Sequence, residues 1–316
     1  MDKPFTHHAA AITTIDTGFK RPGLVASHLI VEGDRAALVD VGVAPTLGRV
    51  LAALDDRGIA RDKVDLLLVT HVHLDHAGAA GVLMRELPNA RLVVHPRGAR
   101  HMIDPSKLIA GATAVYGEAQ MRAEFGDILP VPAERVMEAG DGTVMELNGR
   151  ELLILDTPGH AKHHYCVYDA RSRGFFTGDT FGLSYRPFDS ARGAFAFPTT
   201  TPVQFDPEAM HASIERLLSF NPECMFLTHF GRVEAPGRLA EQLHRHIDGL
   251  VALALAVQER GVDRERLLVQ SLGDYVVDAV AEHGCSLGRD EVLALMHMDI
   301  ALNAQGLVCW LDARGR

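Results

Sequence analysis

The chain has 316 residues, of which 47% are hydrophobic, enough to form a sizeable core. Its 31 lysines and arginines stand against 41 aspartates and glutamates, which gives a formal net charge of −10. An acidic chain without a basic tract is unsuited to general nucleic-acid binding, because such binding depends on neutralising phosphates, so we expect no nucleic-acid partner.

The N-terminal part of the chain is predicted to be a strand meander followed by alternating helices and strands. We predict strands at Ala10 to Thr14, His28 to Glu32, Ala36 to Val39, Val64 to Val69 and Arg91 to His95, and helices at Pro45 to Arg57 and Ala77 to Leu87. A tight turn at Gly33 joins two of the strands into a hairpin. Residues 96–126 lack strand patterning and predict two helices, Pro96 to Ile103 and Pro105 to Phe125.

Strands again precede helices in the second half of the chain. The predicted strands are Thr143 to Leu147, Glu151 to Leu155, Tyr165 to Tyr168, Gly174 to Thr177 and Cys224 to Leu227. Residues 181–205 form a long glycine-, proline- and aromatic-rich loop, which is typical of a functional or mobile segment. Asp206 and Pro207 then suit the first positions of a helix that runs to about Phe220. The doubled pattern predicts an α/β (α+β) fold with two sheets between helical layers.

From Pro236 onward the apolar residues recur at helical spacing. We predict helices from Pro236, near Asp263 to Leu272, Tyr275 to Glu282 and Arg289 to Ala304, and a last short strand at Gly306 to Leu311. The change in pattern places a boundary between a domain of residues 1–235 and a helical region of residues 236–316.

Three histidines and a carboxylate lie within six residues, directly after the predicted strand that ends at Val69. They are His71, His73, Asp75 and His76. Open α/β sheets carry their sites at the carboxyl ends of strands, and imidazole and carboxylate groups suit zinc and neighbouring metals. The loop could begin two metal sites, with His71 and His73 at one and Asp75 and His76 at the other.

Four more strand ends carry residues that can bind a metal. They are Asp40, His160, Asp179 and His229, each beside a glycine or a small residue or directly after a strand. A single histidine after a strand is more often structural than a ligand. Four such positions in a chain that already has the His71 cluster favour a shared metal site.

These motifs, in this order, resemble the metallo-β-lactamase superfamily over about residues 10–235. The resemblance implies an αββα sandwich with a dinuclear metal site at one edge, to which the helical pattern after Pro236 adds an appended C-terminal helical segment. It assigns His71, His73 and His160 to the first metal, Asp75, His76 and His229 to the second, and Asp179 to a bridge between them. Asp40 matches the family's first motif and is expected to orient a ligand histidine.

The motifs look most like the branch with hydroxyacylglutathione hydrolases (glyoxalase II) and acyl-homoserine lactonases. That branch commonly continues after Thr-Pro-Gly-His with a small residue and Gly-His or Gly-Ser, whereas here Ala161, Lys162, His163 and His164 follow, which leaves the substrate class open. No cysteine occupies a metal position, which weighs against β-lactam hydrolysis. His73 stands where oxygen-reactive di-iron relatives usually carry glutamate, which favours zinc while leaving iron and manganese open.

We therefore expect a dinuclear metal-dependent hydrolase that cleaves a small ester, thioester or lactone by a metal-bridging hydroxide. Two divalent ions, most simply Zn²⁺, would lower the pKa of the bridging water to about 7. Asp75 and Asp179 are the expected catalytic residues, with Asp75 carrying a proton to the leaving group. The alternatives are a non-hydrolytic di-iron redox or oxygen-sensing protein of the same fold and, less favoured, a nuclease.

Tyr116, His164, Tyr185 and Arg186 are the candidates for substrate contacts. The long segments at residues 96–125 and 181–205 should wall the metal cleft, and their apolar content favours a small molecule with a hydrophobic part. The C-terminal helices could add to this wall or form the interface of a homodimer. Scattered cysteines, the lack of a signal-peptide pattern and an apolar stretch, Leu250 to Val257, that is too short for a bilayer predict a cytoplasmic protein with no membrane partner.

Overall fold

The computed structural model describes residues 3–200 and 203–314. The chain divides into two compact units, neither of them continuous in sequence. Unit 1 comprises Met1–Asp156, His163–Gly178 and Pro222–Arg232, and unit 2 comprises Thr157–Lys162, Asp179–Asn221 and Val233–Arg316. Each unit is therefore assembled from segments that lie far apart along the chain.

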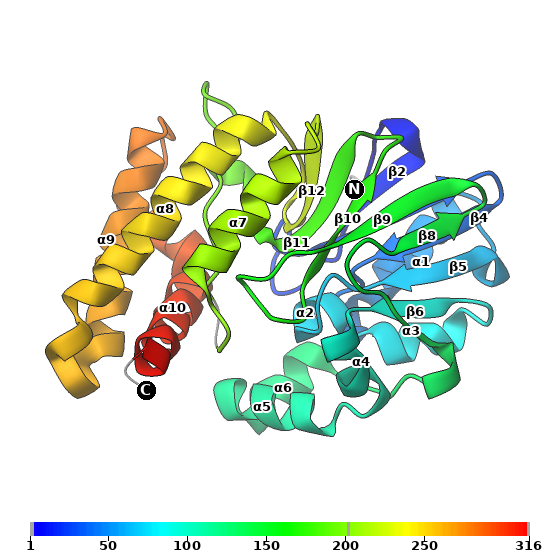
Figure 1. Ribbon diagram of the computed structural model, residues 1–316, viewed down its shortest axis with the longest axis horizontal. Coiled ribbons are helices and arrows are strands. Elements are labelled where there is room, and N and C mark those ends of the chain that lie inside the picture. Colours follow the sequence, from blue (N-terminus) through cyan, green and yellow to red (C-terminus); the bar gives the residue numbers. More distant parts are fainter. Residues whose placement is uncertain (1–2, 201–202, 315–316) are drawn as a thin grey trace. The chain divides into compact units, whose positions relative to one another are not determined.

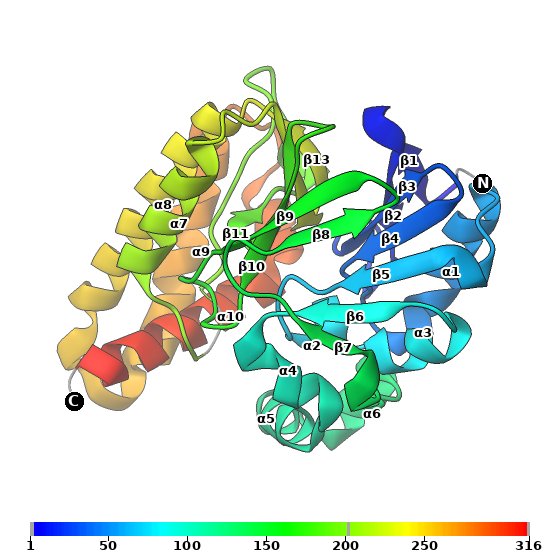
Figure 2. The same ribbon diagram turned by 45° about the vertical axis from the view of Figure 1, so that its right-hand side comes forward.

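Unit 1 contains a seven-stranded sheet whose strands follow the chain in order from β1 to β7, as Figure 2 shows. The strands are β1 (Phe5–His7), β2 (Ile12–Asp16), β3 (Ala26–Glu32), β4 (Arg35–Val39), β5 (Val64–Leu68), β6 (Arg91–Val94) and β7 (Val136–Glu138). The first four pair antiparallel, and β4 to β7 pair parallel. The parallel strands require crossovers, which contain α1 (Leu47–Asp56), α2 (Leu74–Ala77), α3 (Ala80–Glu86), α4 (Pro96–Ile103), α5 (Ser106–Tyr116) and α6 (Glu118–Phe125).

The second sheet has six strands in the order β13-β12-β11-β10-β9-β8. They are β8 (Val144–Leu147), β9 (Arg150–Asp156), β10 (Tyr165–Asp169), β11 (Gly174–Leu183), β12 (Cys224–His229) and β13 (Gly231–Glu234). The neighbouring strands from β8 to β11 pair antiparallel. Strand β11 begins in unit 1 and passes into unit 2 between Gly178 and Asp179.

Alternation along the strands divides the core of unit 1 into two layers. Leu38 of β4 and Leu67 of β5 face a cluster that includes Val50 of α1 and Leu83 of α3. The neighbouring Val39 faces the opposite cluster, in which residues of the first sheet meet apolar residues of the second sheet. Because successive strand residues point to opposite faces, the first sheet is covered by helices on one side and by the second sheet on the other.

Unit 2 is mainly helical. It contains α7 (Pro207–Leu218), α8 (Pro236–Ala256), α9 (Arg264–Glu282) and α10 (Arg289–Arg314), and α8 and α9 lie side by side in Figures 1 and 2. Asp206 accepts a hydrogen bond from the amide of Ala209 at 3.1 Å, which confirms the predicted start of α7. Among the described helices, α10 alone is long and apolar enough to cross a membrane by length and composition, and 39% of its most apolar window is buried.

Several predicted elements differ from those observed. The strand predicted at Gly306 to Leu311 is wrong, because these residues form the last turns of α10. The two helices predicted between Asp263 and Glu282 are one helix, α9. The helix predicted from Pro105 to Phe125 divides into α5 and α6 at Gly117, whose φ of 80° lies outside the helical region. Short edge strands β1, β7 and β13 were not predicted, because three or four residues carry too little alternation.

A buried ion pair ties β9 to the end of β10. The guanidinium of Arg150 donates to both carboxylate oxygens of Asp169, at 2.9 and 2.5 Å, and to the carbonyl of Ala10 at 2.8 Å. The carboxylate also accepts the amides of Arg171 and Ser172 at 3.3 and 3.1 Å. Both charged groups are almost inaccessible, so removal of one partner leaves the other charge unpaired in the interior.

We predict that Arg150→Leu lowers the free energy of unfolding by about 3–5 kcal/mol, measured by urea denaturation. Arg171→Leu is the matched control, since Arg171 is exposed and its ion pair with Glu32 lies at the surface, so its unfolding midpoint should stay unchanged. An Arg150→Leu midpoint equal to that of the wild type would contradict the prediction.

Candidate metal centre

The carboxylate of Asp40 is the buried centre of the ligand-bearing loops in unit 1. It accepts the amide of Thr70 at 2.8 Å and the hydroxyl of Thr70 at 2.9 and 3.0 Å. It also accepts the hydroxyl of Thr228 at 2.7 Å and Nδ1–H of His76 at 2.7 Å. Asp40 is fully inaccessible, and a buried carboxylate is tolerated only when its oxygens are hydrogen-bonded in this way.

Asp75, His76 and His229 converge in unit 1. Their candidate ligand atoms all lie within 4.8 Å of one another. The Nε2 atoms of His229 and His76 lie 3.2 and 3.7 Å from Oδ2 of Asp75. The two histidines are buried, whereas the Asp75 side chain remains 28% exposed. Asp75 thus combines a ligand position with access to solvent.

The hydrogen bonds fix which nitrogen of each histidine is available. Nδ1 of His76 donates to Asp40 at 2.7 Å, and Nδ1 of His229 donates to the carbonyl of Leu24 at 2.9 Å. Because both acceptors lack protons, the neutral rings carry hydrogen on Nδ1 and present a lone pair on Nε2. Histidines that bind metals are oriented in this manner by a carboxylate or a carbonyl on the other nitrogen.

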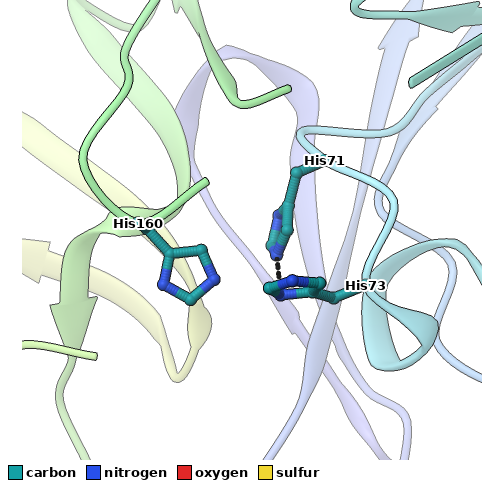
Figure 3. Close-up of side chains that lie close together, drawn as sticks. All are labelled: His71, His73 and His160. Carbon is teal, nitrogen blue, oxygen red and sulfur yellow. Dashed lines mark hydrogen bonds between the residues drawn. The ribbon is translucent and has the colours of Figure 1, made fainter. Parts of the chain in front are cut away.

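His71 and His73 form a second pair in unit 1. Nε2 of His71 lies 2.9 Å from Nδ1 of His73, as the dashed line in Figure 3 shows. Two nitrogens bound to one tetrahedral zinc would lie about 3.3 Å apart, so this pair needs little adjustment. The ring of His164 lies 4.9 Å from that of His71, with the planes 29° apart.

Gly178 allows these groups to lie close together. Its φ is +47°, and a Cβ at this position would lie 2.5 Å from Oγ1 of Thr70 and 2.6 Å from Nε2 of His164. Contacts below 3 Å with packed side chains cannot be accommodated without movement. The glycine before Asp179 is therefore required by packing within unit 1.

Unit 2 carries the remaining two predicted ligands. Nε2 of His160 lies 3.4 Å from Oδ2 of Asp179. Nδ1 of His160 donates to the carbonyl of Thr199 at 3.2 Å and lies 3.0 Å from its hydroxyl. The loop of His160 is held against α7, where Oγ of Ser213 donates to the carbonyl of Pro158 at 2.6 Å. His160 therefore presents Nε2 in the same way as His76 and His229.

These donor sets fit divalent metal ions. All are imidazole nitrogens or carboxylate oxygens, which suit zinc, iron and manganese. The Nε2 atoms of three histidines are left as acceptors by bonds at Nδ1, and carboxylates lie within 3.2 to 3.7 Å of them. Such a set has the chemistry of a metal centre, as the sequence predicted.

The remaining predicted site residues have different surroundings. Tyr185 is fully buried, and its hydroxyl donates to the carboxylate of Asp299 at 3.1 Å. Arg186 donates to the carbonyl and hydroxyl of Ser184 at 2.7 and 2.5 Å. The Tyr116 side chain lies outside the described residues. The assignment of these residues and of His164 to substrate binding stays a prediction.

Sequence reasoning missed the threonines that support the ligands. Thr70 and Thr228 each directly precede a ligand histidine and bind Asp40, whereas Thr199 lies far along the chain from His160. For Thr70 and Thr228, the signal available in the sequence was their position directly before a ligand histidine. Nothing in the local sequence indicates the role of Thr199.

Comparison with known proteins agrees with this chemistry. A metallo-beta-lactamase fold-containing protein from Sulfurisphaera tokodaii is 26% identical over 62% of this chain and 74% of its own length. A hydroxyacylglutathione hydrolase from Aeromonas hydrophila is 28% identical over 60% of this chain and 54% of its own length. An acyl-coenzyme A thioesterase from Gallus gallus is 27% identical over 54% of this chain and 62% of its own length.

Solved structures share the fold. A metallo-beta-lactamase superfamily protein from Sulfolobus tokodaii superposes with a TM-score of 0.67 at 21% identity, over 94% of this chain and 98% of that one. A chemotaxis sensor in a peroxy diiron state gives a TM-score of 0.54 at 18% identity, over 76% and 94% of the two chains. The model of the metallo-beta-lactamase superfamily matches residues 21–229. The chain, with its two sheets, flanking helices and additional C-terminal helices, therefore belongs to the metallo-beta-lactamase superfamily.

Proposed function

We propose that this protein is a dinuclear metal-dependent hydrolase of small thioesters, esters or lactones. The observation that carries the proposal is the set of histidines whose Nδ1 atoms are held by protein acceptors while Nε2 faces a carboxylate. This arrangement prepares metal ligands and is costly to build for packing alone, because it buries many polar groups.

We assign His71, His73 and His160, the three side chains in Figure 3, to one metal ion. Asp75, His76 and His229 would hold the other, and Asp179 would bridge the two. The predominance of imidazole suits zinc, and His73, which stands where oxygen-reactive di-iron relatives usually carry glutamate, favours it over iron. When bound, the ions would supply a hydroxide at neutral pH and polarise the substrate carbonyl.

The chain's own residues would position the metal ligands and carry a proton to the leaving group. Asp40 holds the ring of His76 at a fixed angle through the 2.7 Å bond to Nδ1. Asp75 is the carboxylate in the group with His76 and His229, and its side chain is accessible to solvent. It can therefore take up a proton and release it to a leaving group. Thr199 holds His160 and also donates to the carbonyl of Asp179 at 3.2 Å.

The relatives favour acyl substrates. A hydroxyacylglutathione hydrolase and an acyl-coenzyme A thioesterase are among them, and both names describe cleavage of a thioester. We therefore rank thioesters first and lactones second. The similarity to a di-iron sensor extends to the fold alone, and His73 supplies a nitrogen ligand that suits a hydrolytic zinc site.

We predict that Asp40→Asn weakens metal binding by about 10–100-fold, the usual loss when a group that orients a ligand histidine is changed. An amide cannot accept from Thr70, Thr228 and His76 together. Isothermal titration with zinc measures the effect, and Asp34→Asn, an exposed change on the same unit, should bind as the wild type does.

Thr228→Val keeps Asp40 and removes one hydrogen bond to it, so its loss of zinc affinity should be smaller but in the same direction. Circular dichroism checks that each variant is folded. Unchanged zinc binding in folded Asp40→Asn would show that Asp40 does not support the metal centre.

We predict that Asp179→Ala lowers turnover of a thioester more than about 100-fold, beyond the upper range for groups that only orient a ligand. Loss of a bridging carboxylate should also reduce metal content, measured by plasma mass spectrometry. The exposed Glu208→Ala is the control and should retain activity. Full turnover by Asp179→Ala with both metals present would refute the bridging role.

We predict that the metal-replete protein hydrolyses acyl thioesters and lactones with a hydrophobic part in preference to phosphodiesters. A panel of thioesters, lactones, β-lactams, single-stranded RNA and DNA, compared by kcat/KM, measures this. Preference for a nucleic acid over every carbonyl substrate would contradict the proposal, and visible absorption typical of a di-iron centre without hydrolysis would favour the sensor alternative.

A further inference from the structure

A cavity of about 340 Å³ lies within unit 2, between the first turns of α8 and the end of α9. None of its lining residues belongs to the metal-ligand set. Its size falls at the lower end of the range for small-molecule pockets, about 300–1,000 Å³. The cavity is lined by three arginines, Arg192, Arg238 and Arg245, and by two glutamates, an excess of positive charge in a chain whose net charge is −10.

One wall of the cavity is a turn at residues 190–193, and it is firmly anchored. The guanidinium of Arg192 donates to the carbonyl of Glu282 at 2.7 Å, and Oγ of Ser190 donates to the carbonyl of His283 at 2.8 Å. These bonds satisfy carbonyls at the end of α9 that have no partner within the helix. Gly193, with φ of +89°, leaves room for Arg238, whose guanidinium would lie 3.2 Å from a Cβ.

Two of the arginines have no carboxylate partner within 4.0 Å in the part of the chain that the structure describes. Arg192 and Arg238 donate to main-chain carbonyls, of Glu282 and Ala194 respectively. Arg245 lies 3.7 Å from Glu282, in an exposed pair. Asp189, whose carboxylate also interacts electrostatically with Arg238, pairs with Arg186 at 3.4 Å. A guanidinium group that donates only to neutral carbonyls carries a positive charge that no paired carboxylate neutralises, so it can bind an anion.

The two histidines of the lining differ in their hydrogen bonds. His283 is satisfied at both nitrogens, because Gln242 donates to Nδ1 at 3.1 Å and Nε2 donates to the carbonyl of Gly193 at 2.9 Å. His246 is only 4% exposed, and its Nδ1 lies 3.0 Å from the hydroxyl of Tyr275. Its Nε2 has no hydrogen-bond partner among the described residues.

A buried nitrogen without a hydrogen-bond partner is unfavourable unless a ligand or a water molecule supplies the missing bond. Burial lowers the pKa of His246 to about 4, so the ring is neutral near pH 7. Nε2 is itself inaccessible to solvent, so the neutral ring is part of the cavity's wall and offers no donor to an anion there. The charge available to an anion in the cavity therefore comes from its guanidinium groups, which suit a carboxylate or a phosphate.

We propose that this cavity binds a small metabolite through its carboxylate or phosphate group, held by the arginines. The site is separate in its residues from the metal centre and does not depend on the proposed hydrolysis. Its location on the C-terminal helices gives that region a binding role of its own.

Isothermal titration of the metal-loaded protein with inorganic phosphate and, separately, with succinate tests the proposal. We expect one of the two to bind with a stoichiometry of one and a Kd of about 1 mM or tighter, and to raise the melting temperature. Binding of phosphate alone or of succinate alone identifies the oxyanion class. Heat from neither anion up to about ten times that concentration would overturn the proposal.

Two variants locate the binding. Arg245→Gln removes an exposed charge from the lining, and Arg238→Gln removes a guanidinium that donates only to the carbonyl of Ala194. Each should weaken binding about tenfold, the value of one hydrogen bond to a charged group. Arg266→Gln is the matched control, because Arg266 is an exposed arginine of α9 paired with Asp263 and lies outside the lining.

Anions can also bind to a metal centre, so Asp179→Ala completes the set. Binding that survives Arg245→Gln and Arg238→Gln but disappears in Asp179→Ala belongs to the metals and overturns the proposal. Binding that is retained in Asp179→Ala and weakened by both cavity variants supports it.

Discussion

The carboxylate of Asp40 is the constraint on which the arrangement of unit 1 depends. It follows β4, binds Thr70 after β5, and binds Thr228 near the end of β12. One side chain thus joins strand ends from both sheets at the edge where the ligands lie. The amide of Asp40 adds a bond to the carbonyl of Leu68 at 2.9 Å, so the backbone and the side chain of this residue fix the same loops.

This network explains how loops without regular secondary structure can hold the ligand side chains in fixed positions. A fully buried carboxylate must be satisfied by donors, and the donors here are the threonines that immediately precede His71 and His229. Fixing each threonine fixes the direction of the next residue. The bond from His76 then sets the ring whose Nε2 faces Asp75, so the folding requirement of Asp40 and the geometry of the ligands are met by the same contacts.

How much of the structure could be predicted depended on how many neighbouring residues carried a recognisable pattern. Strands with several apolar residues and the ordered histidine motifs could be located from the sequence, because alternation and ligand type are local properties. The end of α10 could not, because Gly306 to Leu311 is apolar enough for a strand and only continuity with the preceding helix settles its conformation. Thr199 was missed for a related reason: its contact with His160 joins residues about forty positions apart, and no local pattern records such a contact.

The C-terminal helices illustrate the same limit. Their apolar stripe predicted packing, and residues such as Leu239, Leu243 and Leu250 of α8 are indeed buried. The cavity beside them depends on arginines from the 190–193 turn and from α8, which the sequence shows only as scattered charges. Charge that is dispersed in sequence becomes a concentrated feature once the turn is anchored to the end of α9.

We propose that histidine Nε2 atoms, held in place from Nδ1, bind metal ions. An anomalous difference map from crystals of the metal-loaded protein, recorded at the absorption edge of the bound metal, tests it most directly. We expect a peak about 2.1 Å from Nε2 of His76 and His229, beside Asp75, and a second peak at His71, His73 and His160. Peaks only at surface histidines, or none at these residues, would contradict it.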